Sequence, residues 1–214
     1  MHKLITWFQI NYPNYRDEMK NSMHNFDDSD LNPYHLESDC WSHTMMVCKI
    51  AQLEKFAKTV QVAALLHDIG KPSVRKVNPK NNHVQFFGHE IVSAYLSIDI
   101  LSKMLDEKMI NKDEFVETFL LIALHSTFHT EKNIINLFKM FKEYKSLFIH
   151  LVELNKCDNL GRFYENSDTV YTKEKSFKSL SLTMSDAKLP KEIYTFLKQK
   201  PSMNSVVNTI ENLF

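Results

Sequence analysis

The sequence predicts an all-α fold, and three observations support this. The chain has 214 residues but only 3 glycines. Over most of its length, apolar residues recur every three or four positions, which places them on one face of an α-helix. Short alternating runs of the kind that form strands are nearly absent. Helices should therefore build almost the whole fold.

Local signals set several of the expected helix ends. Ser38 and Asp39 precede an apolar run, and either side chain can accept hydrogen bonds from the free N–H groups of a helix that starts there. Gly70 and Pro72 end the next helix. The stretch "SVRKVNPKNNHVQFFGHE" is an exposed loop or short hairpin. The helices expected in chain order are 3–11, 40–57, 59–69, 89–104, 112–129, 131–141, 144–162, 173–183, 190–198 and 203–213.

The chain length matches one domain, which would bury roughly 70% of the surface of its unfolded chain. We expect an N-terminal arm over 1–34, a core over 35–162 and a C-terminal helical extension over 163–214. No internal repeat or linker divides the sequence.

The charge balance limits the partners. Lys+Arg and Asp+Glu both total 26, so the net charge is zero. This argues against an extended nucleic-acid surface but allows a small phosphate-bearing substrate or one nucleic-acid end. The oligomeric state stays open.

Cysteine content and hydropathy predict the compartment. The three cysteines lack paired spacing and are interpreted as reduced thiols of a cytoplasmic protein. No apolar stretch approaches the ~18 residues of a membrane span, so we expect no membrane association.

The stretch "AALLHDIGKPS" places His67 and Asp68 side by side at the end of an apolar run. Burying such polar groups is costly unless they are paired or bind a ligand. Imidazole and carboxylate suit Mn, Fe, Ni and Zn. Further candidate ligands stand at the ends of other apolar segments: His43, His89, His125 and Asp158.

The motifs "YHLESDCWSHTMMV", "AALLHDIGKP", "FFGHE" and "KCDNLGR" resemble the HD-domain metal-dependent phosphohydrolase superfamily over residues 35–162. They are most similar to the HD domain of bacterial CCA-adding tRNA nucleotidyltransferases, which carries phosphatase and phosphodiesterase activity. The resemblance implies an HD-type helical bundle. It also implies a stand-alone relative, since the chain has no room for a nucleotidyltransferase head.

The resemblance implies two metal positions that share Asp68, with one or two divalent ions drawn from Mn, Fe, Ni, Co or Mg. The ligands of the first metal would be His43, His67, Asp68 and Asp158. His89 and His125 match the two extra histidines of binuclear members. His129 lies one helical turn beyond His125 and competes for its role, and His89 has an alternative as a helix cap.

Other polar residues are candidates for substrate contact. Lys71 follows the His-Asp turn and could neutralise a phosphate as a catalytic group beside Asp68, or be a surface lysine. Arg162 could contact substrate or form a salt bridge. The remaining candidates for lining the pocket are Asn159, His35, Glu37 and His129. We interpret His24, His83 and His150 as surface or structural residues.

The expected function is metal-assisted hydrolysis of a phosphate ester of a nucleotide, cyclic nucleotide or nucleic-acid end. Two alternatives remain. A deoxynucleoside triphosphate triphosphohydrolase typically needs only the His, His-Asp, Asp quartet, so His89 and His125 count against it. The other alternative is a catalytically silent HD module that senses nucleotides.

Overall fold

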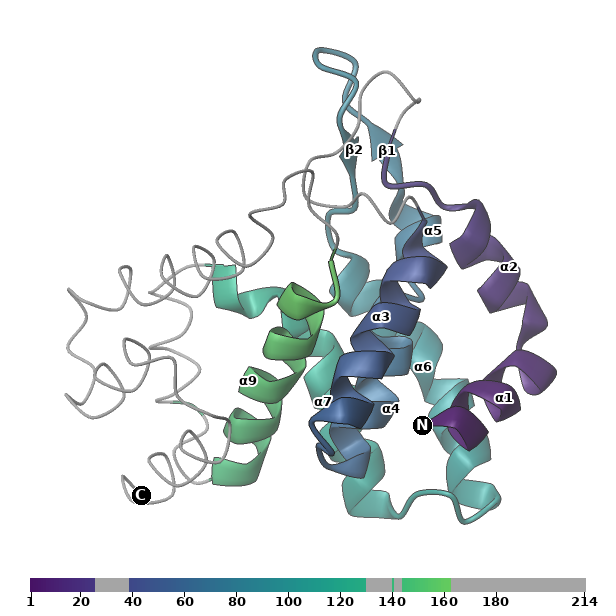
Figure 1. The fold of residues 1–214 in the computed structure, drawn as a ribbon, viewed down its shortest axis with the longest axis vertical. Coiled ribbons are helices and arrows are strands. Elements are labelled where there is room, and N and C mark those ends of the chain that lie inside the picture. The colour runs from purple at the N-terminus through teal and green to yellow at the C-terminus, as the bar shows by residue number, and fades with distance from the viewer. Residues whose placement is uncertain (26–38, 130–139, 141–143, 163–214) are drawn as a thin grey trace, which may run out of the picture.

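The computed structural model describes residues 1–25, 39–129, 140 and 144–162 (Figure 1). The ten expected helices can therefore be compared with the structure only where they fall in these segments. The helices at 131–141, 173–183, 190–198 and 203–213 lie outside the described residues, apart from Met140, as does the C-terminal extension. The elements in chain order are α1 (His2–Asn11), α2 (Pro13–Asn21), α3 (Cys40–Leu53), α4 (Lys58–Leu66), α5 (Lys71–Val74), β1 (Lys76–Val77), β2 (Val84–Gln85), α6 (His89–Asp106), α7 (Lys112–Leu124), η1 (His125–His129) and α9 (Lys145–Leu160).

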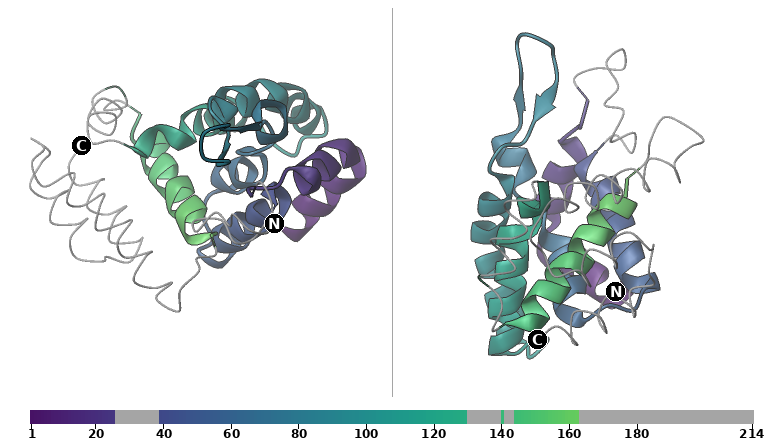
Figure 2. Two further views of the ribbon diagram at one scale, coloured as in Figure 1. Left: turned by 90° about the horizontal axis from the view of Figure 1, so that it is seen from above. Right: turned by 90° about the vertical axis from the view of Figure 1, so that its left-hand side faces the viewer.

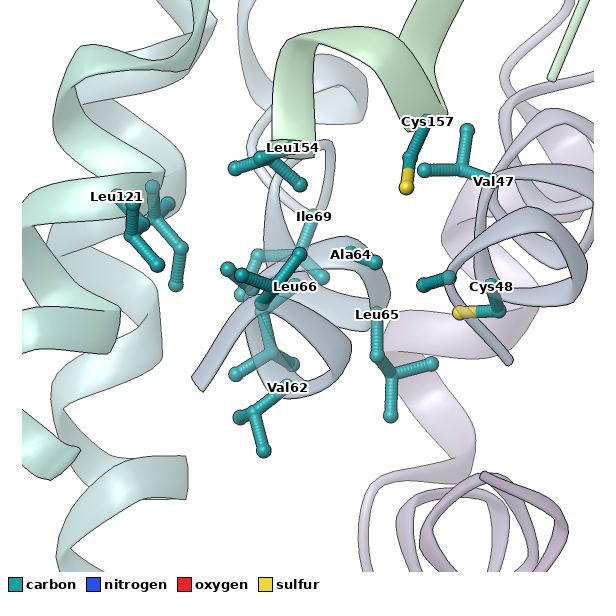
Figure 3. Packing of buried hydrophobic residues seen from close by; sticks show 14 of the residues in the cluster. Val47, Cys48, Val62, Ala64, Leu65, Leu66, Ile69, Leu121, Leu154 and Cys157 are labelled. Carbon is teal, nitrogen blue, oxygen red and sulfur yellow. The ribbon is translucent and has the colours of Figure 1, made fainter. Parts of the chain in front are cut away.

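The all-α prediction is confirmed, and α4 is the central helix of the bundle. It packs against α3, α7 and α9, and α6 pairs with α7 (Figures 1 and 2). A helix surrounded in this way is apolar around most of its circumference. Accordingly, seven of the nine residues of α4 are buried. Figure 3 shows Leu65 and Leu66 pointing to different sides of the helix, toward α3 and α7 respectively.

The hairpin alternative for the loop after Gly70 is confirmed, because β1 and β2 pair antiparallel. Several helix ends are corrected. The helix predicted over 40–57 ends at Leu53, where Lys55 takes a positive φ of 58°. The helix predicted over 112–129 ends at Leu124 and continues as the 3₁₀ turn η1, which tightens the chain at His125.

Two short helices were not predicted. Pro13 begins α2 and Pro72 lies in the first turn of α5. Proline suits the first turn of a helix, where its missing N–H leaves no hydrogen bond unmade. In the sequence, Pro72 indicates the end of the preceding helix, but proline in a first turn also permits a new helix to start.

The N-terminal helices pack on α3 through aromatic residues. Phe8 is fully buried and stacks on Trp41, with ring centroids 6.1 Å apart. Trp7 donates a hydrogen bond of 2.6 Å from Nε1 to Oε2 of Glu107, just beyond α6. The backbone N–H of Cys40 donates to the carbonyl of Ser22. These contacts hold the arm against both α3 and α6.

Two glycines allow elements to approach closely. A Cβ atom at Gly70 would lie 2.5 Å from the backbone nitrogen of Ser93 in α6. A Cβ atom at Gly161 would lie 2.7 Å from Cγ2 of Val47 in α3. Both distances are shorter than any side chain tolerates without movement of its neighbour, so only glycine permits this packing.

The three cysteines are free thiols, as predicted, and the structure shows that all three are buried. Within the described part of the chain, none of the helices combines the length and the apolar character needed to cross a bilayer.

Candidate metal centre

The candidate site lies at one end of the bundle, where five segments meet. His43 is in the second turn of α3, and Asp158 is near the end of α9. His67 and Asp68 form the turn between α4 and α5, and only 1% of the surface of each is exposed. The remaining histidines begin α6 and η1. The site thus forms only when segments distant in sequence fold together.

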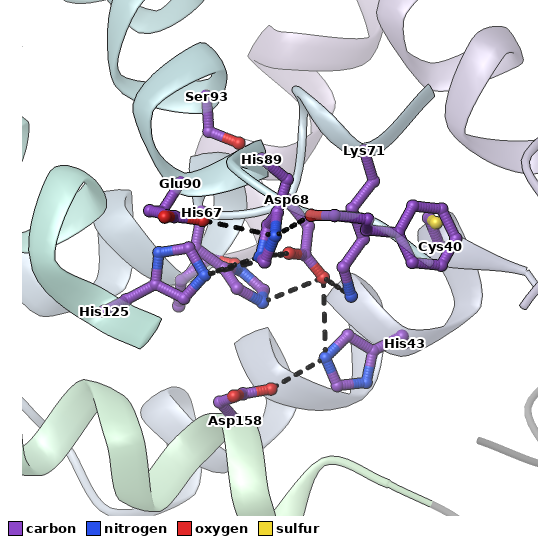
Figure 4. A network of polar contacts seen from close by, with 12 residues as sticks. Cys40, His43, His67, Asp68, Lys71, His89, Glu90, Ser93, His125 and Asp158 are labelled. Atoms are coloured by element: carbon purple, nitrogen blue, oxygen red, sulfur yellow. Dashed lines mark hydrogen bonds and ion pairs between the residues drawn. The ribbon is translucent and has the colours of Figure 1, made fainter. Parts of the chain in front are cut away.

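One group of potential ligands surrounds the Oδ2 atom of Asp68. Nε2 of His67 lies 3.2 Å from this atom, and Nε2 of His43 lies 3.7 Å from it. Asp158 extends the group from α9, with its Oδ1 atom 2.9 Å from Nε2 of His43 (Figure 4). The structure therefore brings together the four residues predicted as ligands of the first metal.

A second group surrounds Oδ1, the other carboxylate oxygen of Asp68. Nε2 of His89 lies 3.3 Å from this oxygen and Nε2 of His125 lies 3.9 Å from it. The two imidazole nitrogens are themselves only 3.1 Å apart. The Asp68 side chain thus faces His43 and His67 with one oxygen and His89 and His125 with the other.

Backbone carbonyls orient three of the four histidines around Asp68. Nδ1 of His67 lies 3.0 Å from the carbonyl oxygen of Ala64, Nδ1 of His89 lies 2.8 Å from that of Phe86, and Nδ1 of His125 lies 2.7 Å from that of Ile122. A carbonyl oxygen can only accept, so each Nδ1 carries the hydrogen. In a neutral ring, Nε2 then presents its lone pair toward Asp68. Metal-binding histidines show this same arrangement.

The residues present fit divalent cations. When both rings are neutral, the Nε2 lone pairs of His89 and His125 face each other at 3.1 Å and repel, and a cation shared by the two nitrogens removes that repulsion. Nε2 of His67 is buried and makes no hydrogen bond to any described residue. His43, His67 and Asp68 form one set of donor atoms within 4.8 Å of one another, and Asp68, His89 and His125 form another. The cluster could therefore hold a metal.

His43 differs from the other histidines, because its Nε2 faces carboxylates. A carboxylate oxygen of Asp158 at 2.9 Å accepts, so this nitrogen donates its hydrogen in the present arrangement. Binding of a cation through Nε2 requires the other neutral tautomer of His43, in which the hydrogen is on Nδ1.

Lys71 provides a positive charge inside the site. Its Nζ atom lies 2.7 Å from Oδ2 of Asp68 and 5.3 Å from the centre of the Phe86 ring. Burial opposes ionisation of Asp68, but the neighbouring His67 and Lys71 hold the pKa of this carboxyl well below its usual range. Burial would also lower the pKa of Lys71, yet Asp68 raises it above the ordinary value. The carboxylate and the ammonium are both charged.

Two further residues have protonation states suited to metal binding. Burial, together with the nearby His67 and His89, lowers the pKa of His125 to about 3. This imidazole is neutral near neutral pH, as a ligand must be. For Asp158, burial acts to raise the pKa, but Arg162 and His43 hold it well below its usual range.

The structure describes the side chains of three of the six predicted substrate-binding residues, namely Lys71, Arg162 and Asn159. Lys71 is buried rather than on the surface. For Arg162 the sequence allowed either a substrate contact or a salt bridge, and the structure shows a salt bridge, with Nη2 2.7 Å from Oδ2 of Asp158. Asn159 donates from Nδ2 to the backbone carbonyl and the side-chain oxygen of Asn155. His35, Glu37 and the side chain of His129 lie outside the described residues, so their roles stay predictions.

Two residues near the site were not predicted. His24 is buried, with its ring 5.9 Å from that of His43 and its Nε2 3.5 Å from Sγ of Cys40. Nothing in the sequence around His24 distinguishes it from a surface or structural histidine. Phe86 belongs to the quoted "FFGHE" motif, but only the fold shows its ring lying beneath Lys71.

Comparison with known proteins agrees with this geometry. The family model described as "HD domain" matches residues 40–160, more than half of the chain. The chain is 29% identical over 155 residues to the "Multifunctional CCA protein" of Paraburkholderia phymatum, a match that covers 72% of this chain and 30% of that relative. No solved structure matches significantly. The chain thus belongs to the HD domain family, whose members are generally metal-dependent hydrolases.

Proposed function

We propose that the protein is a divalent-metal-dependent phosphohydrolase that cleaves a phosphate ester of a nucleotide, a cyclic nucleotide or a nucleic-acid end. The observation that carries this proposal is the position of Asp68. Its two carboxylate oxygens face two different sets of histidine nitrogens. A carboxylate between two sets of nitrogen donors is suited to hold two cations side by side.

Six residues would hold the metals. His43, His67, Asp68 and Asp158 would bind one ion, and Asp68, His89 and His125 the other. When bound, divalent ions such as Mn, Fe, Ni, Co or Mg make water nucleophilic near neutral pH and neutralise charge on phosphate oxygens. This chemistry is the reason for expecting hydrolysis by water rather than by a protein nucleophile.

The surrounding residues would orient the ligands and the substrate. The backbone carbonyls of Ala64, Phe86 and Ile122 fix the ring orientations of three histidines, which reduces the reorganisation needed when a cation binds. Arg162 holds one oxygen of Asp158 and leaves the other directed toward His43. Lys71 supplies an ammonium group that a phosphate oxygen could contact.

Similarity to the relative named as a CCA protein supports a substrate with nucleotide character. The matched region is 30% of that relative, so the similarity concerns only part of it. We therefore include mononucleotides, cyclic nucleotides and nucleic-acid ends in one substrate class.

The test is a screen of nucleoside monophosphates, 2′,3′-cyclic nucleotides and short oligonucleotides ending in phosphate, each with Mn, Ni, Co, Mg or Fe. We expect hydrolysis of at least one class, loss of this activity after metal removal, and its return when metal is added. The variant His67→Ala should be inactive, whereas His2→Ala, an exposed histidine on α1, should retain full activity. Absence of hydrolysis with every metal, or full activity of His67→Ala, would contradict the proposal.

A further inference from the structure

The hairpin formed by β1 and β2 connects the two halves of the candidate metal centre. It begins just after α5, which carries Lys71, and ends just before His89. Figures 1 and 2 show that the hairpin extends beyond the helices at the end of the bundle where α5 lies and α6 begins. Neither the proposed metal ligands nor the hydrophobic core explains this projection.

The hairpin and its flanks concentrate positive charge. Between Ile69 and His89 the chain has four lysine or arginine residues and no aspartate or glutamate, although the whole chain carries 26 residues of each sign. Lys76 and Lys80 are exposed, and neither forms an ion pair with a described residue. The ammonium groups of these two lysines, on the hairpin next to the candidate metal centre, are therefore accessible to a polyanion.

Arg75 shows that the charges of this segment are not equivalent. Its Nε atom donates to the carbonyl oxygen of Met23, and its Nη2 atom donates to that of Asn25. This arginine anchors the base of the hairpin to the segment after α2. These hydrogen bonds give Arg75 a structural role. No such contact with a described residue explains the positive charges of Lys76 and Lys80.

An exposed aromatic ring lies at the foot of the same hairpin. Phe86 packs against Lys71, but the neighbouring Phe87 has 81% of its surface exposed. Aromatic rings beside cations are the combination with which proteins bind single-stranded nucleic acids, because bases stack on the rings while cations contact the backbone. Phe87 is two residues from His89, so a base stacked on it would lie close to the metal centre.

We propose that the hairpin binds a single strand of nucleic acid and so directs the terminal phosphate of that strand to the metal centre. This inference rests on the proposed function and narrows its substrate class to strand ends. The extended chain from Asn82 at the tip to Phe87 spans on the order of 15 Å. A ligand that contacts both the metal centre and Lys80 is therefore longer than one nucleotide.

Binding can be measured without hydrolysis. The probe is a fluorescein-labelled RNA of about five nucleotides that ends in a 3′-phosphate, titrated with the full-length protein in EDTA and followed by anisotropy. The double variant Lys76→Glu, Lys80→Glu should raise Kd by about tenfold or more at low salt. Loss of two phosphate contacts should also reduce the slope of log Kd against log salt by about 1.4. Phe87→Ala should raise Kd with little change in that slope.

The matched control reverses the charge of two exposed lysines at the opposite end of the bundle, Lys108 just after α6 and Lys112 at the start of α7. The variant Lys108→Glu with Lys112→Glu should bind the RNA like the wild type. Circular dichroism should show that all variants are folded, and Lys76→Gln with Lys80→Gln provides a milder second test. Equal Kd values for wild type and hairpin variants would overturn the inference. So would equal weakening by the control pair.

Kinetics separate this inference from the proposed function. If the protein is active, the double variant Lys76→Glu, Lys80→Glu should raise KM for the oligonucleotide and leave hydrolysis of the matching nucleoside 3′-monophosphate unchanged. An equal effect on both substrates would overturn the role in strand selection. If neither substrate is hydrolysed, the proposed function fails while the anisotropy result still decides whether the hairpin binds RNA.

Discussion

Asp68 and Lys71 form a buried ion pair whose members depend on each other. Asp68→Asn should destabilise the metal-free protein by about 3 kcal/mol, because it leaves the Lys71 ammonium buried with no charged partner at 2.7 Å. The double variant Asp68→Asn, Lys71→Met should recover most of this loss, since it removes both charges. Urea unfolding in EDTA is measured for four proteins: the wild type, Asp68→Asn, Lys71→Met and the double variant. Additive effects of the two substitutions would show that the pair is not coupled.

A second ionic contact lies away from the metal centre and should make stability depend on pH. Nδ1 of His150 in α9 is 2.8 Å from Oε1 of Glu117 in α7. Burial acts to lower the pKa of His150, but Glu117 raises it above the ordinary 6.5. Burial acts to raise the pKa of Glu117, but His150 lowers it below the ordinary 4.5.

The sign of this pH dependence follows from the two shifts. The contribution of His150 is complete below pH 6.5 and is lost as the pH rises through its folded pKa, while that of Glu117 is lost on acidification below 4.5. The free energy of unfolding should therefore fall by about 1 kcal/mol from about pH 6 to about pH 8.5. The variant His150→Gln should show a smaller fall in the free energy of unfolding over this pH range. The double variant His150→Gln, Glu117→Gln should show the same small fall as His150→Gln. An unchanged pH profile in His150→Gln would contradict this.

Single residues of the site were predictable to different degrees. His67 and Asp68 stand out because two polar groups end an apolar run. The ion pair between Lys71 and Asp68 was not predictable, because a lysine after a turn is equally compatible with the surface. His24 was not predictable either, since its position beside His43 depends on how the segment after α2 folds back.

At the scale of elements, the glycines at the ends of helices determine how closely the ligand-bearing segments approach. Gly161→Ala should push α9 away from α3 and so separate Asp158 from His43. Gly70→Ala should separate the His-Asp turn from the start of α6, which carries His89. We expect each to cost about 1–3 kcal/mol in unfolding free energy. Each should also weaken binding of Mn, as measured by calorimetry.

Gly88 provides the matched control for these substitutions. A Cβ atom there would meet nothing within 4 Å, but the residue has a φ of 79°. Gly88→Ala should therefore cost about 1 kcal/mol through backbone strain alone, and Gly88→Asn should cost less because asparagine tolerates this conformation. Equal metal affinity of Gly161→Ala and the wild type would contradict the role assigned to close packing.

The existence of most described helices was predictable from apolar spacing, but their ends were less so. Asp39 was one of two predicted capping residues, and it accepts from the backbone N–H of Ser42. The conversion of α7 into η1 was not predictable, because no glycine or proline marks the end of the apolar run at Leu124. That turn matters to the site, since it begins at His125.

At the scale of the whole molecule, the ligands join segments from Cys40 to Leu160, so metal binding should stabilise the entire bundle. A ligand that binds only the folded state at 100 times its Kd adds about 2.7 kcal/mol to the free energy of unfolding. We expect Mn to raise the Tm of the wild type. His89→Ala with His125→Ala should retain part of this increase, because the other set of ligands remains.

Elemental analysis of the same samples provides the control for this prediction. Loss of the second set of ligands should lower the bound metal from about two ions per chain to about one. A ratio near one in both proteins would refute the binuclear arrangement. A Tm insensitive to Mn would indicate that the cluster does not bind this ion in the folded protein.

The stacking of Trp41 on Phe8 also has a practical consequence. The chain contains 2 tryptophans, and Trp41 is buried two residues before His43. Replacement of Trp7 by phenylalanine would leave Trp41 as the single indole. Trp41 contacts Phe8 of the N-terminal arm and lies in α3, the helix that carries His43. Its fluorescence emission would then serve as an intrinsic optical reporter that detects both release of the arm and events at His43.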